Sequence, residues 1–165
     1  MIKKLFVILL MGLSCSSCQA QSKKNQPNRA VSLVAPKGKA VAAFAEGCFW
    51  CSEHIYESVA GIDSAIAGYS GGNTVNPTYE EVCSETTGHA ESVLIYYNPK
   101  IISYKELIKV FFTSHDPTTL NRQGPDEGSS YRSVIFYQNE TEKMLAKQAL
   151  SELTLRGAFK RPIVT

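Results

Sequence analysis

The sequence lacks an apolar run long enough to cross a membrane. Its longest apolar stretch, residues 5–13, spans nine residues, whereas a transmembrane helix needs about twenty. Acidic residues are missing from residues 1–40, which carry seven Lys or Arg. Of the 17 basic and 15 acidic residues in the chain, ten and fifteen remain after residue 40, a net charge of about −5. Because an acidic domain repels the phosphate backbone, nucleic-acid binding is not expected.

Cysteine is also scarce. The five cysteines are too few and too unevenly placed for a small domain held together by disulfides. No second pair of Cys or His stands at the spacing that a Cys-x-x-Cys zinc site requires. We therefore expect no metal site. No internal repeat is visible, and 165 residues suffice for one domain with its own core.

The first 18 residues have the pattern of an export signal. Lys3 and Lys4 form a charged start, residues 5–13 form an apolar segment, and small residues follow. Cys15 and Cys18 at its end resemble the cysteine of bacterial lipoprotein signals, and the sequence leaves open which of the two would be lipidated. We expect an exported, cell-envelope protein, either periplasmic or a membrane-anchored lipoprotein. Residues 19–40 have the composition of a polar, basic linker.

From residue 41 to residue 165 the pattern alternates between strands and helices. A capping box, Ser103 to Glu106, begins one helix, and Pro117 is expected to stop it. The other expected elements are strands at 41–45, 62–68, 93–97 and 132–137, and helices at 48–59, 76–82 and 139–153. This order predicts an α+β fold of the ferredoxin-like, split βαβ type. Such a domain is a two-layer sandwich with a mainly antiparallel sheet, to which the long loop 116–131 is an addition.

Two cysteines stand together at the expected start of the helix at 48–59. Cys48 follows a strand, and the amides and dipole of a helix N-terminus favour a thiolate there, which makes Cys48 a candidate nucleophile. Cys51, one turn later, could then form a disulfide with it. The spacing also fits a buried pair of thiols or a thiol-disulfide oxidoreductase, so it does not decide between these functions.

Other side chains could handle a proton or a polar oxygen. Glu91 stands just before a strand, where burial would raise its pKa and make it a proton donor; an ordinary solvated carboxylate is the alternative. Tyr79 and Tyr131 stand at loop edges, where a phenol can hydrogen-bond an oxygen or simply pack. His115 and Asp116 have the pattern of a helix stop and are interpreted as structural.

Several motifs together resemble one known family, peptide methionine sulfoxide reductase of the A type. They are Gly47-Cys48-Phe49-Trp50, Gly68-Tyr69-Ser70-Gly71-Gly72, Asn76-Pro77-Thr78-Tyr79, Glu81-Val82-Cys83-Ser84, Thr87-Gly88-His89-Ala90-Glu91, His115-Asp116-Pro117-Thr118, Asn121-Arg122-Gln123-Gly124 and Tyr131-Arg132-Ser133. The resemblance implies an enzyme that reduces the S epimer of methionine sulfoxide, free or in proteins, and so repairs oxidised proteins. It implies electrons from thioredoxin or a similar dithiol and no bound cofactor, and we expect a monomer.

The resemblance also implies a role for each site residue. Cys48 matches the nucleophile, which becomes a sulfenic acid, and Glu91 matches the proton donor. Tyr79 and Tyr131 match the tyrosines that bind the sulfoxide oxygen. The substrate-binding residues are Phe49 and Trp50, which form an apolar wall for the S-methyl group, and Asp126, which orients the site.

Two departures from the family pattern bear on recycling and on the loop. Many relatives carry resolving cysteines in a C-terminal tail, whereas this chain ends at Thr165; the domain is therefore expected to be truncated there, and Cys51 to resolve the sulfenic acid. Where relatives usually have Gly-Thr-Gln-Tyr, this chain has Gly128-Ser129-Ser130-Tyr131. Cys83 is expected to be a buried structural thiol. The alternatives are a thiol-disulfide oxidoreductase and a module that binds methionine sulfoxide without turnover.

Overall fold

The computed structural model describes residues 33–165. The expected export signal and most of the linker lie outside the described residues. The first strand, β1 (Ala40–Glu46), begins one residue before the expected boundary. Lys39, just ahead of it, forms an ion pair with Asp63 in the next strand at 2.8 Å. No helix among the described residues is long and apolar enough to cross a membrane.

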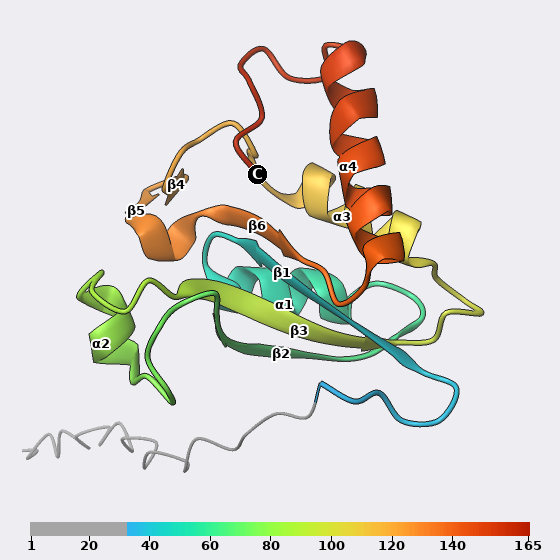
Figure 1. The fold of residues 1–165 in the computed structure, drawn as a ribbon, viewed down its shortest axis with the longest axis horizontal. Helices are drawn as coiled ribbons and strands as arrows, with labels where there is room; N and C mark the ends of the chain where they lie inside the picture. Colours follow the sequence, from blue (N-terminus) through green and yellow to red (C-terminus); the bar gives the residue numbers. More distant parts are fainter. Residues whose placement is uncertain (1–32) are drawn as a thin grey trace, which may run out of the picture. The chain divides into compact units, whose positions relative to one another are not determined.

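A four-stranded antiparallel sheet forms the centre of the fold (Figure 1). The strands follow the order β2-β3-β1-β6, in which every neighbouring pair is antiparallel. The further bounds are β2 (Ile62–Ser70), β3 (Ala90–Tyr97) and β6 (Ser133–Phe136). If β1, β2, β3 and β6 are numbered 1 to 4, the strand order read from the β6 edge is 4-1-3-2, as in the split βαβ pattern. The expected α+β, ferredoxin-like fold is therefore confirmed.

Both long helices between strands cover the same face of the sheet. Phe44 of β1 packs ring against ring with Tyr56 of α1 (Phe49–Glu57) and with Tyr104 and Phe111 of α3 (Tyr104–Ser114). Val93, which pairs with Phe44 across the sheet, is also fully buried. The core therefore lies between one sheet face and two helices, as alternation along the strands requires.

Local sequence signals set the helix ends. The capping box before α3 forms as expected: Ser103 Oγ accepts from the Glu106 amide, and the Glu106 carboxylate accepts from the Ser103 amide at 2.7 Å. The helix ends at Ser114, three residues before Pro117. The last helix, α4 (Glu140–Leu155), packs beside α3 and has no fully buried residue (Figure 1).

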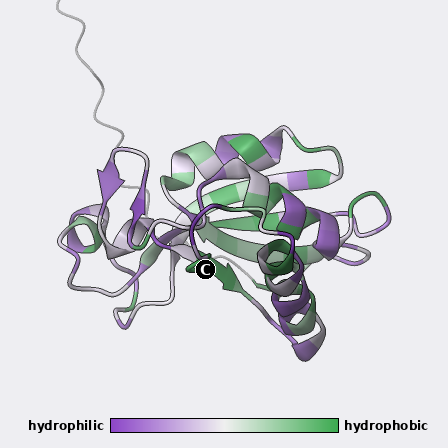
Figure 2. Cartoon of the chain, turned by 90° about the horizontal axis from the view of Figure 1, so that it is seen from above, coloured by the Kyte–Doolittle hydropathy of each residue, from purple (hydrophilic) through white to green (hydrophobic). Residues whose placement is uncertain are grey.

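The long loop after α3 carries short regular elements. They are β4 (Arg122–Gln123), β5 (Asp126–Glu127) and the 3₁₀ turn η1 (Ser129–Tyr131). Another short element, α2 (Tyr79–Cys83), precedes β3. Figure 2 shows that the β4–β5 hairpin is hydrophilic, whereas apolar residues concentrate on the central strands. These polar additions belong to the part of the domain that carries the candidate site.

Candidate active site

Cys48 is the residue that precedes the first turn of α1. It occupies the N-cap position, and its carbonyl accepts from the amides of Cys51 and Ser52, both at 3.1 Å. The expectation that Cys48 opens this helix is confirmed. The left-handed Gly47 (φ 104°) turns the chain from β1 into the helix, and a Cβ at Gly47 would come within 2.6 Å of the Gln123 side chain. Glycine is therefore needed beside Cys48.

The cysteine pair is accessible and not buried. Cys48 is partly exposed and Cys51 is exposed, and neither forms a disulfide in this structure. The buried face of α1 consists instead of Phe49, Ser52 and Tyr56. The interpretation of the two thiols as a buried pair is therefore wrong. A hydrogen bond with Cys48 raises the pKa of Cys51, with further contributions from desolvation and nearby negative charge.

Glu91, the second residue of β3, reaches the same helix end. Its Oε2 accepts a hydrogen bond from the Phe49 amide at 3.0 Å, and the residue is only 3% exposed. Burial raises the pKa of Glu91; the Phe49 amide opposes that shift, and the charge of Asp126 adds to it. The alternative of a solvated glutamate is wrong, because this carboxyl is buried and binds the amide of Phe49, the residue after Cys48.

The tyrosines lie around this carboxyl. Burial, followed by the charge of Glu91, raises the pKa of Tyr131 to about 12. A hydrogen bond with Cys83 raises the pKa of Tyr79, and Glu91 and Cys48 contribute as well. Both phenols therefore stay protonated near neutral pH and can donate hydrogen bonds. The structure brings together residues of α1, α2, β3 and η1 that are far apart in sequence.

An aromatic wall lies beside Cys48. Phe49 is buried and Trp50 is 60% exposed, with 5.0 Å between their ring centroids. Tyr79 stacks on both rings, at 6.5 Å from Phe49 and 6.0 Å from Trp50. This wall provides an apolar surface that could contact a methyl group or a thioether sulfur.

On another side, Cys48 and Cys51 line a pocket of about 210 Å³ together with Asp126 and Glu46. Burial raises the pKa of Glu46 to about 7, against a hydrogen bond from Ser114 Oγ at 2.9 Å. Asp126 also lies near Glu91, as its effect on that pKa shows. Asp126 therefore lines the pocket of the thiol pair, and its charge contributes to the raised pKa of the buried acid. Within residues 33–165, no three His, Cys, Asp or Glu side chains are grouped so that they could hold a metal ion.

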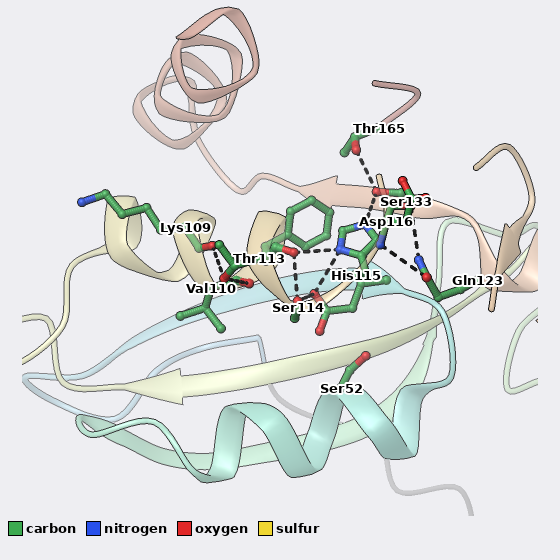
Figure 3. Close-up of polar contacts among 12 residues, drawn as sticks. Ser52, Lys109, Val110, Thr113, Ser114, His115, Asp116, Gln123, Ser133 and Thr165 are labelled. Atoms are coloured by element: carbon green, nitrogen blue, oxygen red, sulfur yellow. Dashed lines mark hydrogen bonds and ion pairs between the residues drawn. The ribbon is translucent and has the colours of Figure 1, made fainter. Parts of the chain in front are cut away.

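His115 is a structural residue in this fold, as expected. Its Nδ1 donates to the Phe111 carbonyl and its Nε2 bonds to Ser133 Oγ, both at 2.7 Å (Figure 3). Burial lowers the pKa of His115, so the ring is neutral and Ser133 donates to Nε2. Asp116 caps the following turn through Thr118, also as expected.

Tyr69 and Glu85 lie near the site although the sequence predicts no role for them, and the expected burial of Cys83 is wrong. Tyr69 pairs directly with Glu91 across β2 and β3, and its ring packs on Phe49 at 5.4 Å. Glu85 binds the turn that carries Tyr131. Cys83 is exposed and not buried, because it lies at the end of the short surface helix α2. The strand register and the loop contacts involved cannot be read from one sequence.

Residues 40–165 match the family model described as peptide methionine sulfoxide reductase. The peptide methionine sulfoxide reductase MsrA of Methanosarcina acetivorans is 53% identical over 129 residues, which cover 78% of this chain and 69% of that protein. The chain belongs to the peptide methionine sulfoxide reductase family. Membership confirms the expected peptide-methionine (S)-S-oxide reductase class and disfavours the alternative of a thiol-disulfide oxidoreductase.

Solved structures of the family agree with this assignment. Reduced Mxr1 from Saccharomyces cerevisiae has a TM-score of 0.71 and 35% identity, with 81% of each chain covered. Mxr1 in complex with Trx2 has a TM-score of 0.56 and 28% identity, covering 81% of this chain and 82% of that one. Mxr1, which is similar to this chain, is therefore seen bound to Trx2.

Proposed function

We propose that this domain reduces methionine S-sulfoxide with Cys48 as nucleophile and Glu91 as proton donor. The observation that carries the proposal is the 3.0 Å hydrogen bond from the Phe49 amide to the buried Glu91 carboxyl. It holds a carboxyl of raised pKa at the N-terminus of α1, beside the partly exposed Cys48. A sulfoxide bound over Cys48 can therefore receive a proton on its oxygen while the thiolate attacks its sulfur.

The remaining residues act on the developing charge and on the substrate methyl group. The hydroxyls of Tyr79 and Tyr131 donate hydrogen bonds to the sulfoxide oxygen as negative charge grows on it. Phe49 and Trp50 contact the S-methyl group through the aromatic wall. A bond forms between the Cys48 sulfur and the substrate sulfur as the protonated oxygen leaves as water. A water molecule then attacks the Cys48 sulfur, and the sulfur–sulfur bond breaks with its electron pair on the substrate sulfur. The products are methionine, as a thioether, and a sulfenic acid on Cys48.

Cys51 recycles the enzyme in this proposal. Its thiol attacks the Cys48 sulfenic acid, the sulfur–oxygen bond breaks, and the oxygen leaves as water with the thiol proton. A dithiol such as thioredoxin then reduces the Cys48–Cys51 disulfide. The position of Cys51 one turn after Cys48, with its amide on the Cys48 carbonyl at 3.1 Å, supports this role.

One assay tests the reaction. The domain is supplied with dithiothreitol and methionine sulfoxide of defined epimer, and methionine is measured for wild type, Cys48→Ser and Glu91→Gln. We expect turnover of the S epimer only, no product from Cys48→Ser and strongly reduced product from Glu91→Gln. Equal turnover of the R epimer, or full activity without Cys48, would overturn the proposal.

We also propose that the protein is exported and anchored by lipid at Cys15 or Cys18. The support is the charged start, the apolar segment and the cysteines of the first 18 residues. Partitioning into a detergent phase and the mass of the mature protein test this proposal. An unmodified product in the aqueous phase would contradict it and would leave the reductase assignment untouched.

A further inference from the structure

Glu85 links two segments that are 44 residues apart in the sequence. It follows α2, and its carboxylate accepts hydrogen bonds from the η1 turn. Ser130 donates to it twice, from Oγ at 2.6 Å and from its amide at 3.2 Å, and Ser129 Oγ donates at 2.5 Å. Ser130 is only 3% exposed. The next residue after this serine pair is Tyr131.

The backbone around this contact is shaped for close approach. Glu85 has φ of 61°, a left-handed conformation that is unfavourable for a non-glycine residue. Gly128, with φ of 140°, lies against the carboxylate, and a Cβ at this position would overlap Glu85 Oε1. A strained residue persists only where its surroundings hold it. Here the hydrogen bonds from Ser129 and Ser130 do so.

Arg132 forms a second link on the other side of Tyr131. Its Nη1 donates to the Ser129 carbonyl at 2.8 Å, and its Nη2 donates to the Gly88 carbonyl at 2.9 Å. Gly88 stands three residues before Glu91 in the same strand-entry segment. The segment that supplies the acid and the turn that supplies the phenol are therefore joined at two points, with Tyr131 between them.

We propose that Glu85 is a positioning residue that fixes the Tyr131 hydroxyl relative to Glu91. It acts through the serine pair and does not touch the substrate. Hydrogen bonds from Ser129 and Ser130 outweigh the effect of burial and lower the pKa of Glu85, so it is ionised near neutral pH and cannot be a proton donor. A displacement of about 1 Å in such a group can cost up to a hundredfold in rate. The inference rests on the oxygen-binding role proposed for Tyr131.

The serine pair stands where this chain departs from the family pattern Gly-Thr-Gln-Tyr. Within residues 33–165, the donors to Glu85 at 3.2 Å or less are the hydroxyls of Ser129 and Ser130 and the Ser130 amide. Two short hydroxyl side chains allow the carboxylate to approach the turn directly. The link is therefore a feature of this chain's own sequence.

Glu85→Gly is the most informative substitution. Glycine adopts the left-handed backbone without strain, so this variant removes the carboxylate and does not weaken the local backbone. We expect methionine formed in the first turnover to appear about tenfold more slowly, with no decrease in Tm. Ser130→Ala removes the link from the other side and is expected to act in the same direction. Glu57→Gln, at the exposed end of α1, is the matched control and should match wild type.

A double-mutant cycle separates positioning from a general structural effect. In a Tyr131→Phe background, Glu85→Gly is expected to cost less than twofold, because the hydroxyl that it positions is already absent. An equal loss in both backgrounds would overturn the proposal, and so would no loss in the parent. If Tyr131→Phe alone has no effect, the role proposed for Tyr131 fails, and a loss in Glu85→Gly would then show action on another group.

The position of Tyr131 can also be tested by a measurement that does not depend on activity. ¹⁹F NMR of 3-fluorotyrosine placed at position 131 reports the surroundings of the ring. Glu85→Gly is expected to shift and broaden this resonance and to lower the phenol pKa, while a label at Tyr79 stays unchanged. An unchanged resonance at position 131 overturns the positioning role. A wild-type enzyme that makes no methionine overturns the proposed function instead.

Discussion

Cys48 and Cys51 stand one turn apart at the start of α1, and the Cys48 thiol raises the pKa of Cys51. Their backbones are joined as well, since the Cys51 amide donates to the Cys48 carbonyl at 3.1 Å. The helix therefore holds the second sulfur one turn from the first, where the proposed disulfide would form. Recycling then needs no large movement of the chain.

Cys51→Ser should separate reduction from recycling. The variant is expected to release one methionine per enzyme and then stop with thioredoxin as reductant, because the sulfenic acid on Cys48 lacks its partner thiol. Methionine per enzyme, measured in a single mixing experiment, gives the result. Cys83→Ser is the control and should keep turning over, and sustained turnover of Cys51→Ser would contradict the role of Cys51.

Glu91→Gln should slow the first turnover by about a hundredfold at neutral pH, the typical contribution of a general acid. Glutamine can still accept from the Phe49 amide, so Tm should change little. In wild type the acid form is needed, so the rate is present below the raised pKa of Glu91 and is lost as pH rises through it. Rapid-quench measurements from pH 5 to pH 9 check both points. A profile with the same slope in Glu91→Gln would contradict the assignment.

Tyr131→Phe and Tyr79→Phe should each lower the first-turnover rate about tenfold. A hydrogen bond that forms only as charge develops contributes to the transition state and not to substrate binding. The loss should therefore be in kcat, with KM nearly unchanged. Tyr137→Phe, an exposed tyrosine beyond β6, serves as control. A rise in KM with kcat unchanged would assign these phenols to binding instead.

Glu46 should make the domain less stable as pH rises. Its pKa is raised from 4.5 to about 7, so between these values the folded state holds more protons than the unfolded state. The free energy of unfolding therefore falls across this range, by about 3 kcal/mol for a shift of this size. Among the described residues, Glu46 Oε1 has no hydrogen-bond partner that would stabilise the charge.

Glu46→Gln tests this linkage by urea unfolding at several pH values. The groups next to Glu46 are Ser52 and Tyr56 from α1, Ser114 at the end of α3 and His115 directly after it. His115, whose pKa is lowered, contributes the opposite slope, but it does so in both proteins. The stability of the variant relative to wild type should therefore rise from pH 5 to pH 8. A difference that does not change with pH would contradict the prediction.

Gly47→Ala should destabilise the turn into α1. The left-handed backbone costs about 1–2 kcal/mol, and the new Cβ would push on Gln123, which hydrogen-bonds the Asp116 amide and carbonyl. We expect a total loss of about 2 kcal/mol, or roughly 8 °C in Tm. Gly157 also has a positive φ, but no atom lies within 4 Å of the place where its Cβ would be, so Gly157→Ala should lower the stability less. Equal losses would show that Gln123 gives way freely.

The sequence predicts the elements well where the signal is local. The capping box before α3, the strand alternation and the cysteine at a helix start all depend on neighbouring residues, and all are present. The loop 116–131 differs, because its β4 and β5 strands are too short for a pattern to predict and its η1 turn is held by the distant Glu85. The face that α1 buries is also set by packing, and it contains Ser52 and Tyr56.

The site residues also divide into those with a local signal in the sequence and those placed by distant contacts. Cys48 and Glu91 can be proposed from their positions along the chain, together with the family resemblance. That Tyr69 lies opposite Glu91 depends on the register of two strands, which no local pattern specifies. Glu85 becomes visible only once the η1 turn lies against it, 44 residues later in the chain.

The unequal exposure of the two thiols determines which sulfur of their disulfide a reductant would attack. Cys51 is exposed and Cys48 is only partly so. An incoming thiolate must approach the bond in line, and the accessible sulfur is that of Cys51. The intermediate that we expect therefore joins the reductant to Cys51, with Cys48 as the leaving group. The Cys48 sulfur would then be free for the next substrate while the reductant is still joined to Cys51.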